Sequence, residues 1–285
     1  MRYGRCMADS TSHVNDIVLK QGMTIPQVGF GTYQIPPEET AERVEQAIEA
    51  GYRHIDTAAG YHNEAGVGKA IRRSGLERSD IFVTTKLQNS DHGADRAIEA
   101  LDNSRRALGL DVIDLYLIHW PVPSKDLFVE TWRSMIRMLN TGAVRALGVS
   151  NFLPHHLDRL RDETGVTPVI LQTEVHPSFS QPDVLSDARN RGMVIEAYSP
   201  LGQARDLEDP VILDIAERAG VTVAQAVLAW HMQRGRVVIP KTTSPERMEE
   251  NLAAAGVSLP ETDLEAIDAL HSESGRIGAH PDEFE

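Results

Sequence analysis

The chain has 285 residues and a formal net charge of −14, from 42 acidic and 28 basic side chains. This length allows one large domain with a well-buried core. The acidic balance argues against a broad surface for nucleic acids or anionic membranes. Cys6 is the only cysteine, which excludes an internal disulfide framework. No segment has the length of a membrane span and the N-terminus lacks the apolar region of a signal peptide, so we expect a cytoplasmic protein without a membrane partner.

A leader and a hairpin are the first elements expected. Residues 1–13 have the character of a disordered leader, and residues 14–285 are expected to form a single domain. Apolar residues at 17–19 and 23–25 flank Gln21-Gly22, a pattern typical of a β-hairpin. We expect this hairpin to close one end of the main fold.

Short apolar runs, most of them ending in a polar residue, alternate with helical stretches such as 38–50, 94–108 and 211–219. This alternation predicts parallel βαβ units. Repeated right-handed crossovers in one chain close most naturally into a (β/α)₈ TIM barrel. The runs cover residues 28–31, 55–56, 82–86, 115–119, 148–151, 169–172, 195–198 and 237–241.

An open doubly wound sheet is the alternative architecture, and it needs a glycine-rich turn between strand and helix. The segment 66–71 lacks the third glycine and lies within a helical stretch, so it indicates helix packing. At the C-terminal end, residues 261–271 have helical spacing. Residues 272–285 are rich in Gly, Pro and charge and are expected to form a tail near the mouth of the barrel.

In a barrel, the polar residues that follow the strands meet at one face, where the chemistry of this fold is found. Asp56, Lys86 and His119 follow three consecutive strands, and Tyr61 shares a loop with Asp56. A free phenol has a pKa of about 10, and a neighbouring ammonium lowers it by roughly 1–3 units. We expect Lys86 to make Tyr61 a proton donor, Asp56 to hold Lys86 charged, and His119 to orient a substrate carbonyl.

Taken together, these residues and the motifs around them resemble the aldo-keto reductase superfamily. Motifs in the same order and spacing carry the resemblance from about Ile17 onward, and the segment 274–283 is similar to the bacterial branch with the 2,5-diketo-D-gluconate reductases. The motifs are Gly51 to Ala58 with Tyr61 to Glu64, Asp114 to Pro121, Gly148 to Phe152, and Ile239 to Arg247.

The resemblance implies an NADPH-dependent reductase that converts aldehydes, ketones or α-dicarbonyls to alcohols, with Asp56, Tyr61, Lys86 and His119 as the catalytic tetrad. Small carbonyl compounds, with methylglyoxal and 2,5-diketo-D-gluconate among the candidates, are the expected substrates, and a monomer is the expected state. The cofactor site is expected to comprise Thr32, Asp56, Ser150, Asn151, Gln172, Tyr198, Ser199, Leu201, Gln203, Lys241, Thr242, Ser244, Arg247, Glu250 and Asn251.

Within that set, Ser150, Asn151 and Gln172 would hold the nicotinamide carboxamide, and Tyr198 would stack on the ring. The loop with Ser199, Leu201 and Gln203 would follow the pyrophosphate, and Glu250 with Asn251 would meet the adenine. The segment with Lys241, Thr242, Ser244 and Arg247 would bind the 2′-phosphate, because an ammonium and a guanidinium favour NADPH over NADH.

Four residues are expected to contact the substrate: Tyr33, Gln88, His119 and Trp120. Gln88 stands where relatives often carry tryptophan, which predicts a more polar pocket at that point. Leu171, where relatives often have asparagine, is expected to affect local packing only.

Each of these residues also has a structural interpretation. Asp56 and Lys86 can form an ion pair at the barrel rim, and His119 can be a core histidine. Tyr198 and Trp120 can be core aromatics, and Lys241 with Arg247 can be an exposed charged pair. Taken together, the residues favour the catalytic interpretation.

Two other functions are compatible with parts of the pattern. In a metal-dependent hydrolase, His54, Asp56 and His119 would bind a cation that activates water, but Tyr61 and Lys86 would then have no role. A non-catalytic NADPH-binding sensor or partner subunit would keep the site without turnover. The pair His155-His156 lacks further ligands at a usable spacing and is expected to be an exposed helix start, so no metal is predicted.

Overall fold

The computed structural model describes residues 16–19 and 22–285. Its centre is an eight-stranded sheet in the order β10-β9-β8-β7-β6-β5-β4-β3, in which all neighbouring strands are parallel. The strands are β3 (Phe30–Gly31), β4 (His54–Asp56), β5 (Phe82–Leu87), β6 (Ile113–Ile118), β7 (Val144–Ser150), β8 (Ile170–Glu174), β9 (Val194–Tyr198) and β10 (Val237–Val238).

The two ends of this sheet meet. Val28 forms a parallel bridge with Val238, and the Gly29 N–H donates a 2.8 Å hydrogen bond to the Val238 carbonyl. The Val238 N–H in turn donates to the Gln27 carbonyl at 2.9 Å. The barrel is therefore closed, as the sequence predicted, and it has no free edge strand in this ring.

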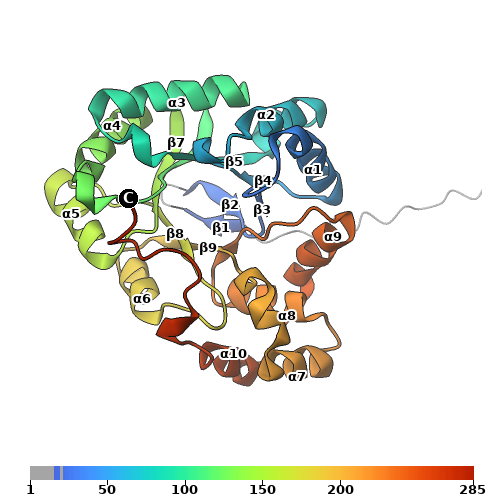
Figure 1. Cartoon of the computed structure of the whole chain (residues 1–285). Helices are drawn as coiled ribbons and strands as arrows, with labels where there is room; N and C mark the ends of the chain where they lie inside the picture. The colour runs from blue at the N-terminus through green and yellow to red at the C-terminus, as the bar shows by residue number, and fades with distance from the viewer. Residues whose placement is uncertain (1–15, 20–21) are drawn as a thin grey trace, which may run out of the picture.

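Helices surround the barrel, as Figure 1 shows. The predicted helices over 38–50, 94–108 and 211–219 are confirmed to within one residue, whereas the last helix ends at Asp268 rather than at 271. The helices are α1 (Pro37–Ala50), α2 (Glu64–Arg73), α3 (Ala94–Leu108), α4 (Phe128–Asn140), α5 (Pro154–Thr164), α6 (Pro182–Asn190), α7 (Pro210–Ala219), α8 (Val223–Gln233), α9 (Pro245–Ala253) and α10 (Glu261–Asp268).

Local sequence sets the ends of these helices, and α1 is an example. Pro37 occupies its first turn, where the missing N–H costs nothing, and Glu38 and Glu39 there complement the positive end of the helix dipole. Gly51 ends the helix at φ 115°, a conformation that side chains with a Cβ rarely adopt. The chain then turns back into β4, which carries Asp56.

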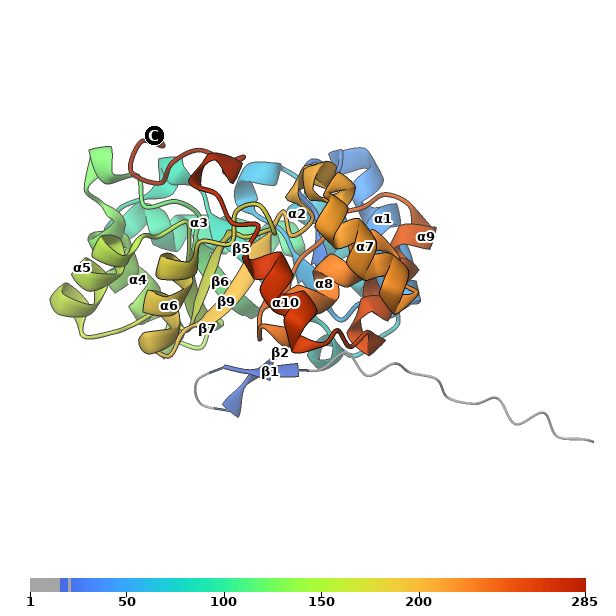
Figure 2. The ribbon, with the colours of Figure 1, turned by 90° about the horizontal axis from the view of Figure 1, so that it is seen from below.

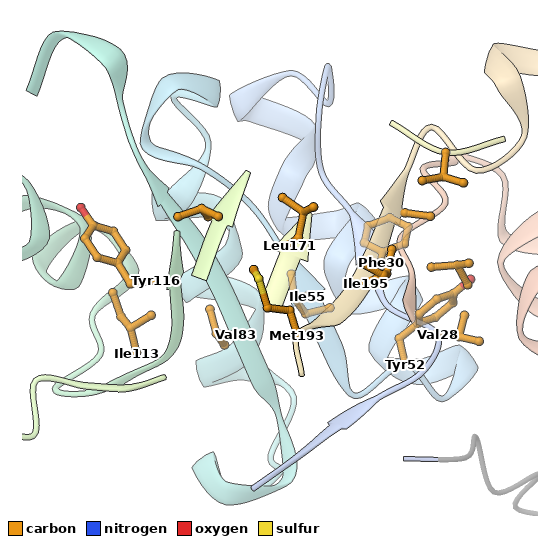
Figure 3. Close-up of a cluster of buried hydrophobic side chains, with 14 of the residues drawn as sticks. Val28, Phe30, Tyr52, Ile55, Val83, Ile113, Tyr116, Leu171, Met193 and Ile195 are labelled. Carbon is orange, nitrogen blue, oxygen red and sulfur yellow. The ribbon is translucent and has the colours of Figure 1, made fainter. Parts of the chain in front are cut away.

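The core lies mainly between the strands and the surrounding helices. Figure 3 shows Ile55, Val83, Tyr116, Leu171 and Ile195 in this layer, all of them buried. Successive residues of a strand face opposite sides of a sheet, so the neighbours of these residues face the barrel interior. In this way burying Ile55 outside the barrel places Asp56 inside it.

The barrel interior changes character along its length. Near the lower end it is apolar, with Leu19 and Ile25 packed against barrel residues that include Phe82, Leu115 and Ile170. The predicted hairpin is present as β1 (Asp16–Val18) and β2 (Thr24–Pro26), which pair antiparallel. Figure 2 shows the hairpin below the barrel, on the side opposite the C-terminal tail. It closes that end, as predicted.

The tail (residues 272–285) lies over the other end of the barrel (Figure 2) and contains the short 3-10 helix η8 (Glu273–Gly275). The predicted leader, residues 1–13, lies outside the described residues. Across residues 16–19 and 22–285, no helix combines the length and the apolar character needed to cross a bilayer.

Candidate active site

Four polar side chains converge at the carboxyl ends of the first strands. Asp56 ends β4, Lys86 lies near the end of β5, His119 follows β6, and Tyr61 ends the short 3-10 helix η2 (Ala59–Tyr61). The Lys86 Nζ donates hydrogen bonds to Asp56 Oδ1 at 2.6 Å and to the Thr57 carbonyl at 2.9 Å. It lies 5.1 Å from the centroid of the Tyr61 ring. The structure therefore brings together the four residues that the sequence singled out.

Burial and charge shift the pKa values of this group. Burial alone would lower the pKa of Lys86, but Asp56 and Tyr61 raise it above its usual value, so the ammonium is retained. Burial and the charge of Lys86 lower the pKa of His119 to about 3, which leaves a neutral imidazole. Its ring centroid lies 5.7 Å from that of Tyr61.

Tyr61 differs from the expectation. From the sequence, Lys86 is expected to bring the pKa of Tyr61 below that of a free phenol, but burial raises this pKa and outweighs the lowering effect of Lys86. The phenol is thus protonated at neutral pH and carries the hydrogen needed by a proton donor. The role of Lys86 here is to limit the rise that burial causes.

Two further buried side chains, Gln172 and Glu196, adjoin Asp56, and Glu196 was not predicted as a site residue. The Gln172 Nε2 donates to Asp56 Oδ2 and to Glu196 Oε2, each at 2.8 Å. Glu196 is fully buried, and burial and the charge of Asp56 raise its pKa to about 8. The signal in the sequence was its position two residues before Tyr198, which places both side chains on one face of β9.

Two adjoining cavities open from these residues. The first, of about 430 Å³, contains the side chains around Tyr61 and His119, and the second, of about 660 Å³, extends towards α9. They share Tyr33, Ser199, Pro200, Gln203 and Lys241 in their linings, so they form one continuous groove.

The first cavity includes the predicted nicotinamide residues Ser150, Asn151, Gln172 and Tyr198. Asn151 adopts φ 64°, and its Nδ2 donates to the His119 carbonyl and to Ser150 Oγ, both at 3.0 Å. The Tyr198 hydroxyl donates to Asn151 Oδ1 at 2.8 Å. These bonds link the tyrosine, the amide and the loop of His119 into one unit.

The loop after β9, residues 199–208, connects the two cavities, and we call it the cofactor loop. Its backbone has positive φ at Ser199, Gln203 and Ala204, which are not glycines. Conformations of this kind cost free energy and persist only where the surroundings enforce them, often at binding sites. Leu201 lines the second cavity, and Ser199 and Gln203 line both.

The second cavity is lined at its far end by Lys241, Thr242, Arg247, Glu250 and Asn251, as predicted for the adenosine end of a dinucleotide. Two cationic side chains beside the N-terminus of α9 suit a phosphate dianion. The residues present therefore fit NADPH. Ser244 caps α9 by accepting from the Arg247 N–H at 3.3 Å, and neither it nor Thr32, whose Oγ1 donates to the Asp56 carbonyl at 3.0 Å, lines either of these two cavities.

Aromatic residues form the outer wall of the first cavity. Tyr33 is 54% exposed and its ring lies 5.1 Å from that of Tyr61, whereas Trp120 stacks on Phe284 of the tail. Gln88, predicted to make the pocket polar, lines neither cavity. The tail lies near the mouth, as the sequence predicted, and it adds three lining residues that the sequence did not indicate, Gly278, Ala279 and Phe284.

The histidine pair at the start of α5 also differs from the expectation. His155 is exposed but His156 is buried, and Asp282 of the tail lies 3.0 and 3.2 Å from their Nε2 atoms. These three are the one potential metal-binding group found among the described residues. However, His156 Nδ1 accepts from the Leu153 N–H at 3.1 Å, so the lone pair of this nitrogen is already used and in the neutral ring Nε2 carries the hydrogen. The hydrogen bond between His155 and Asp282 links the tail to α5.

The hydrogen-bond partners of Asp56 and His54 argue against the metal-dependent hydrolase alternative. Asp56 already accepts from Lys86 and Gln172, and His54 Nε2 lies 3.0 Å from Thr84 Oγ1. These side chains are engaged with other residues instead of facing a common cation.

Comparisons with known proteins agree with this geometry. A family model described as "Aldo/keto reductase family" matches residues 27–272. The chain is 46% identical over 268 residues to an aldo-keto reductase of Mycobacterium sp. (strain JLS), covering 94% of this chain and 97% of the relative. It is 44% identical over 270 residues to methylglyoxal reductase DkgA of Escherichia coli (strain K12), with the same coverages. The crystal structure of a mutant of Gox0644 in complex with NADPH superposes with a TM-score of 0.92 at 42% identity, covering 95% of this chain and 98% of that one.

A closed parallel barrel with an Asp-Tyr-Lys-His group beside a dinucleotide-sized groove defines an oxidoreductase that uses a nicotinamide cofactor. The chain belongs to the aldo-keto reductase family. It is an NADP(H)-dependent enzyme that reduces small carbonyl compounds.

Proposed function

We propose that Tyr61 is the proton donor of this reductase and that Asp56, Lys86 and His119 prepare the site for it. The observation that carries the proposal is the buried ion pair of Lys86 and Asp56, whose ammonium lies 5.1 Å from the Tyr61 ring at the wall of the first cavity. A buried ammonium next to a phenol stabilises the phenolate that forms when the proton leaves.

The reaction then divides between cofactor and protein. When bound, NADPH would supply the hydride that the carbonyl carbon accepts. The carbonyl oxygen takes the proton from the Tyr61 hydroxyl, which gives an alcohol and leaves a phenolate beside Lys86. His119, neutral because of its low pKa, orients the carbonyl by a hydrogen bond and adds no competing charge.

For the cofactor, Ser150, Asn151 and Gln172 would hold the carboxamide and Tyr198 would stack on the nicotinamide. The cofactor loop would cover the pyrophosphate through Ser199, Leu201 and Gln203. Lys241, Thr242 and Arg247 would bind the 2′-phosphate with Ser244 as the helix cap, and Glu250 and Asn251 would meet the adenine. Thr32 would act indirectly, by fixing the backbone of Asp56.

α-Dicarbonyls such as methylglyoxal are the substrates we favour, with sugar-derived ketones such as 2,5-diketo-D-gluconate next. The Escherichia coli relative is named a methylglyoxal reductase, and the first cavity is compact and bounded by Tyr33, Trp120 and Phe284. Gln88 would influence the substrate only indirectly, by packing against the adjacent η2 loop.

The test follows NADPH consumption with a panel of α-dicarbonyls, aldehydes and 2,5-diketo-D-gluconate, for the unaltered protein and for Tyr61→Phe. We expect the variant to lose about 10²–10⁴-fold in kcat while the Kd for NADPH stays within about twofold. Full turnover by Tyr61→Phe would refute the proton-donor role. NADPH binding without turnover of any carbonyl would favour a sensor instead.

We further infer that the protein acts as a monomer in the cytoplasm. Its strong net charge opposes self-association, and its single cysteine suits a reducing compartment. Sedimentation velocity at micromolar concentration tests the first point, with one species near 31.4 kDa as the expected result.

A further inference from the structure

A buried histidine outside the catalytic group links the cofactor loop to the tail. His176 follows β8 and is fully buried. Its Nδ1 lies 2.8 Å from Asp206 Oδ2, and its Nε2 lies 3.1 Å from Glu174 Oε1. Burial alone would lower the pKa of His176, but the two carboxylates raise it, so the ring suits a donor at both nitrogens.

The first carboxylate belongs to the cofactor loop. Asp206 lies in the 3-10 helix η6 (Gly202–Glu208), a few residues after Gln203, which lines both cavities. The Ser178 N–H also donates a hydrogen bond to Asp206 Oδ2, with an N–O distance of 3.4 Å. A Cβ on Gly202 would come within 2.5 Å of Asp206 Oδ2, so the loop packs directly on this carboxylate. A change in the backbone of the loop therefore moves Asp206.

The second carboxylate holds the tail. Glu174 accepts from the Ile277 N–H at 2.6 Å and from the Gly278 N–H at 2.7 Å. A Cβ on Gly278 would lie 2.7 Å from Glu174 Oε2 and 3.4 Å from the Tyr198 hydroxyl. We call this pair of hydrogen bonds the clasp. After it in the sequence, Ala279 and Phe284 line the first cavity. The orientation of Glu174 thus sets the position of the wall that faces the substrate.

We propose that His176 is a positioning residue that couples cofactor binding to placement of the tail, through the chain Asp206, His176, Glu174 and the backbone of Ile277 and Gly278. This inference rests on the proposed role of the cofactor loop in binding NADPH. When the loop closes on the cofactor, Asp206 is fixed, His176 keeps Glu174 in line, and the tail is held over the substrate. By linkage, a tail held in place raises the affinity for the cofactor by the same factor.

Arg276 provides a direct readout, because trypsin cleavage after it releases residues 277–285. The release is followed by mass spectrometry with and without saturating NADPH, and the Kd for NADPH is measured in parallel by quenching of protein fluorescence. In the unaltered protein we expect NADPH to slow the release by about fivefold or more. The protection factor is the rate of release without NADPH divided by the rate at saturating NADPH. In His176→Asn we expect faster release without cofactor and a protection factor close to one.

His155→Asn is the matched control, because His155 contacts Asp282 of the same tail but makes no link to the cofactor loop. We expect it to speed the release with and without NADPH and to leave the protection factor unchanged. Gly278→Ala provides a second test that keeps His176 unchanged, since the added Cβ meets Glu174 Oε2 from the side of the tail. Gly278→Ala should lower the protection factor as His176→Asn does. If His176→Asn does not fold, Gly278→Ala alone tests the coupling between the cofactor loop and the tail.

Two results would overturn the coupling. The first is an unchanged protection factor in folded His176→Asn or in Gly278→Ala. The second is equal loss of protection in His155→Asn, which would show that any loosening of the tail has this effect. A failure of NADPH to bind the unaltered protein would instead refute the proposed function, and the coupling with it.

Discussion

Phe284 stacks on Trp120 with ring centroids 4.2 Å apart and an interplanar angle of 29°. The two residues lie 164 positions apart in the chain and together form part of the wall of the first cavity. The wall of the first cavity is thus completed by a residue of the tail that is far from Trp120 in the sequence.

Phe284→Ala tests this wall. We expect KM for the preferred carbonyl to rise by about fivefold or more with kcat less affected, because the variant removes an aromatic pair worth about 0.5–1.5 kcal/mol together with its buried area. Steady-state kinetics at saturating NADPH measure both constants. Glu283→Gln, a neighbouring and exposed position, is the control. Unchanged KM in Phe284→Ala would remove Phe284 from the pocket.

Lys86→Met tests the buried ion pair. Removing one partner leaves the Asp56 carboxylate buried without its counter-charge, and breaking a pair in this way typically costs about 3–5 kcal/mol of the free energy of unfolding. Urea unfolding of Lys86→Met, Asp56→Asn and the double variant forms a cycle. We expect the double variant to be more stable than Lys86→Met. Additive losses would mean that the two side chains do not interact.

Glu196 predicts a pH dependence of stability. Its pKa in the folded protein is about 8, above the ordinary value of 4.5. The folded state therefore holds this proton more tightly, so stability from this group is full below pH 4.5 and is lost as the pH rises towards about 8. Urea midpoints at pH 6 and pH 9 measure the loss for the unaltered protein and for Glu196→Gln.

Glu196→Gln cannot ionise, so its loss between the two pH values should be smaller than that of the unaltered protein, by a difference on the order of a few kcal/mol. An identical loss in both proteins would show that Glu196 does not titrate in this range.

Arg247→Ala tests the 2′-phosphate contact. Hydrogen bonds to charged groups contribute about 1.5–3 kcal/mol, so KM for NADPH should rise by roughly tenfold or more, whereas KM for NADH should change little. Glu249→Gln, exposed on the same helix, controls for a general change in charge. A parallel rise for both cofactors would place Arg247 away from the phosphate.

The strands and the catalytic group could be predicted because a parallel barrel imposes two strong patterns. Its strands are apolar runs, and the polar residues at their carboxyl ends must meet, which is how Asp56, Lys86 and His119 were found. Tyr61 followed from its proximity in sequence to Asp56. The alternation of side chains along β9 places Glu196 on the same face as Tyr198. Its role inside the barrel is recognisable only when its partner Gln172 is seen beside it.

Contacts across long stretches of sequence were the part that could not be predicted. His156 lies close to Asp282 of the tail, and the role of Glu174 depends on two backbone N–H groups of the tail. Backbone groups have no sequence signature, and the tail lacks the periodicity that reveals a helix or a strand. Gln88 lines neither cavity, because its position relative to them depends on how the neighbouring loop folds, which the sequence does not indicate.

The clasp between Glu174 and the tail has a consequence for how this enzyme can change. Its donors are main-chain N–H groups, which every residue except proline supplies, so the attachment needs no particular side chain at 277, whereas position 278 must stay small because a Cβ there would meet Glu174 Oε2. Ala279 and Phe284, which line the first cavity beyond Gly278, can therefore vary while Glu174 keeps its two donors. Substrate preference can be redesigned there by exchanging a segment a few residues long, without repacking the barrel that performs the chemistry.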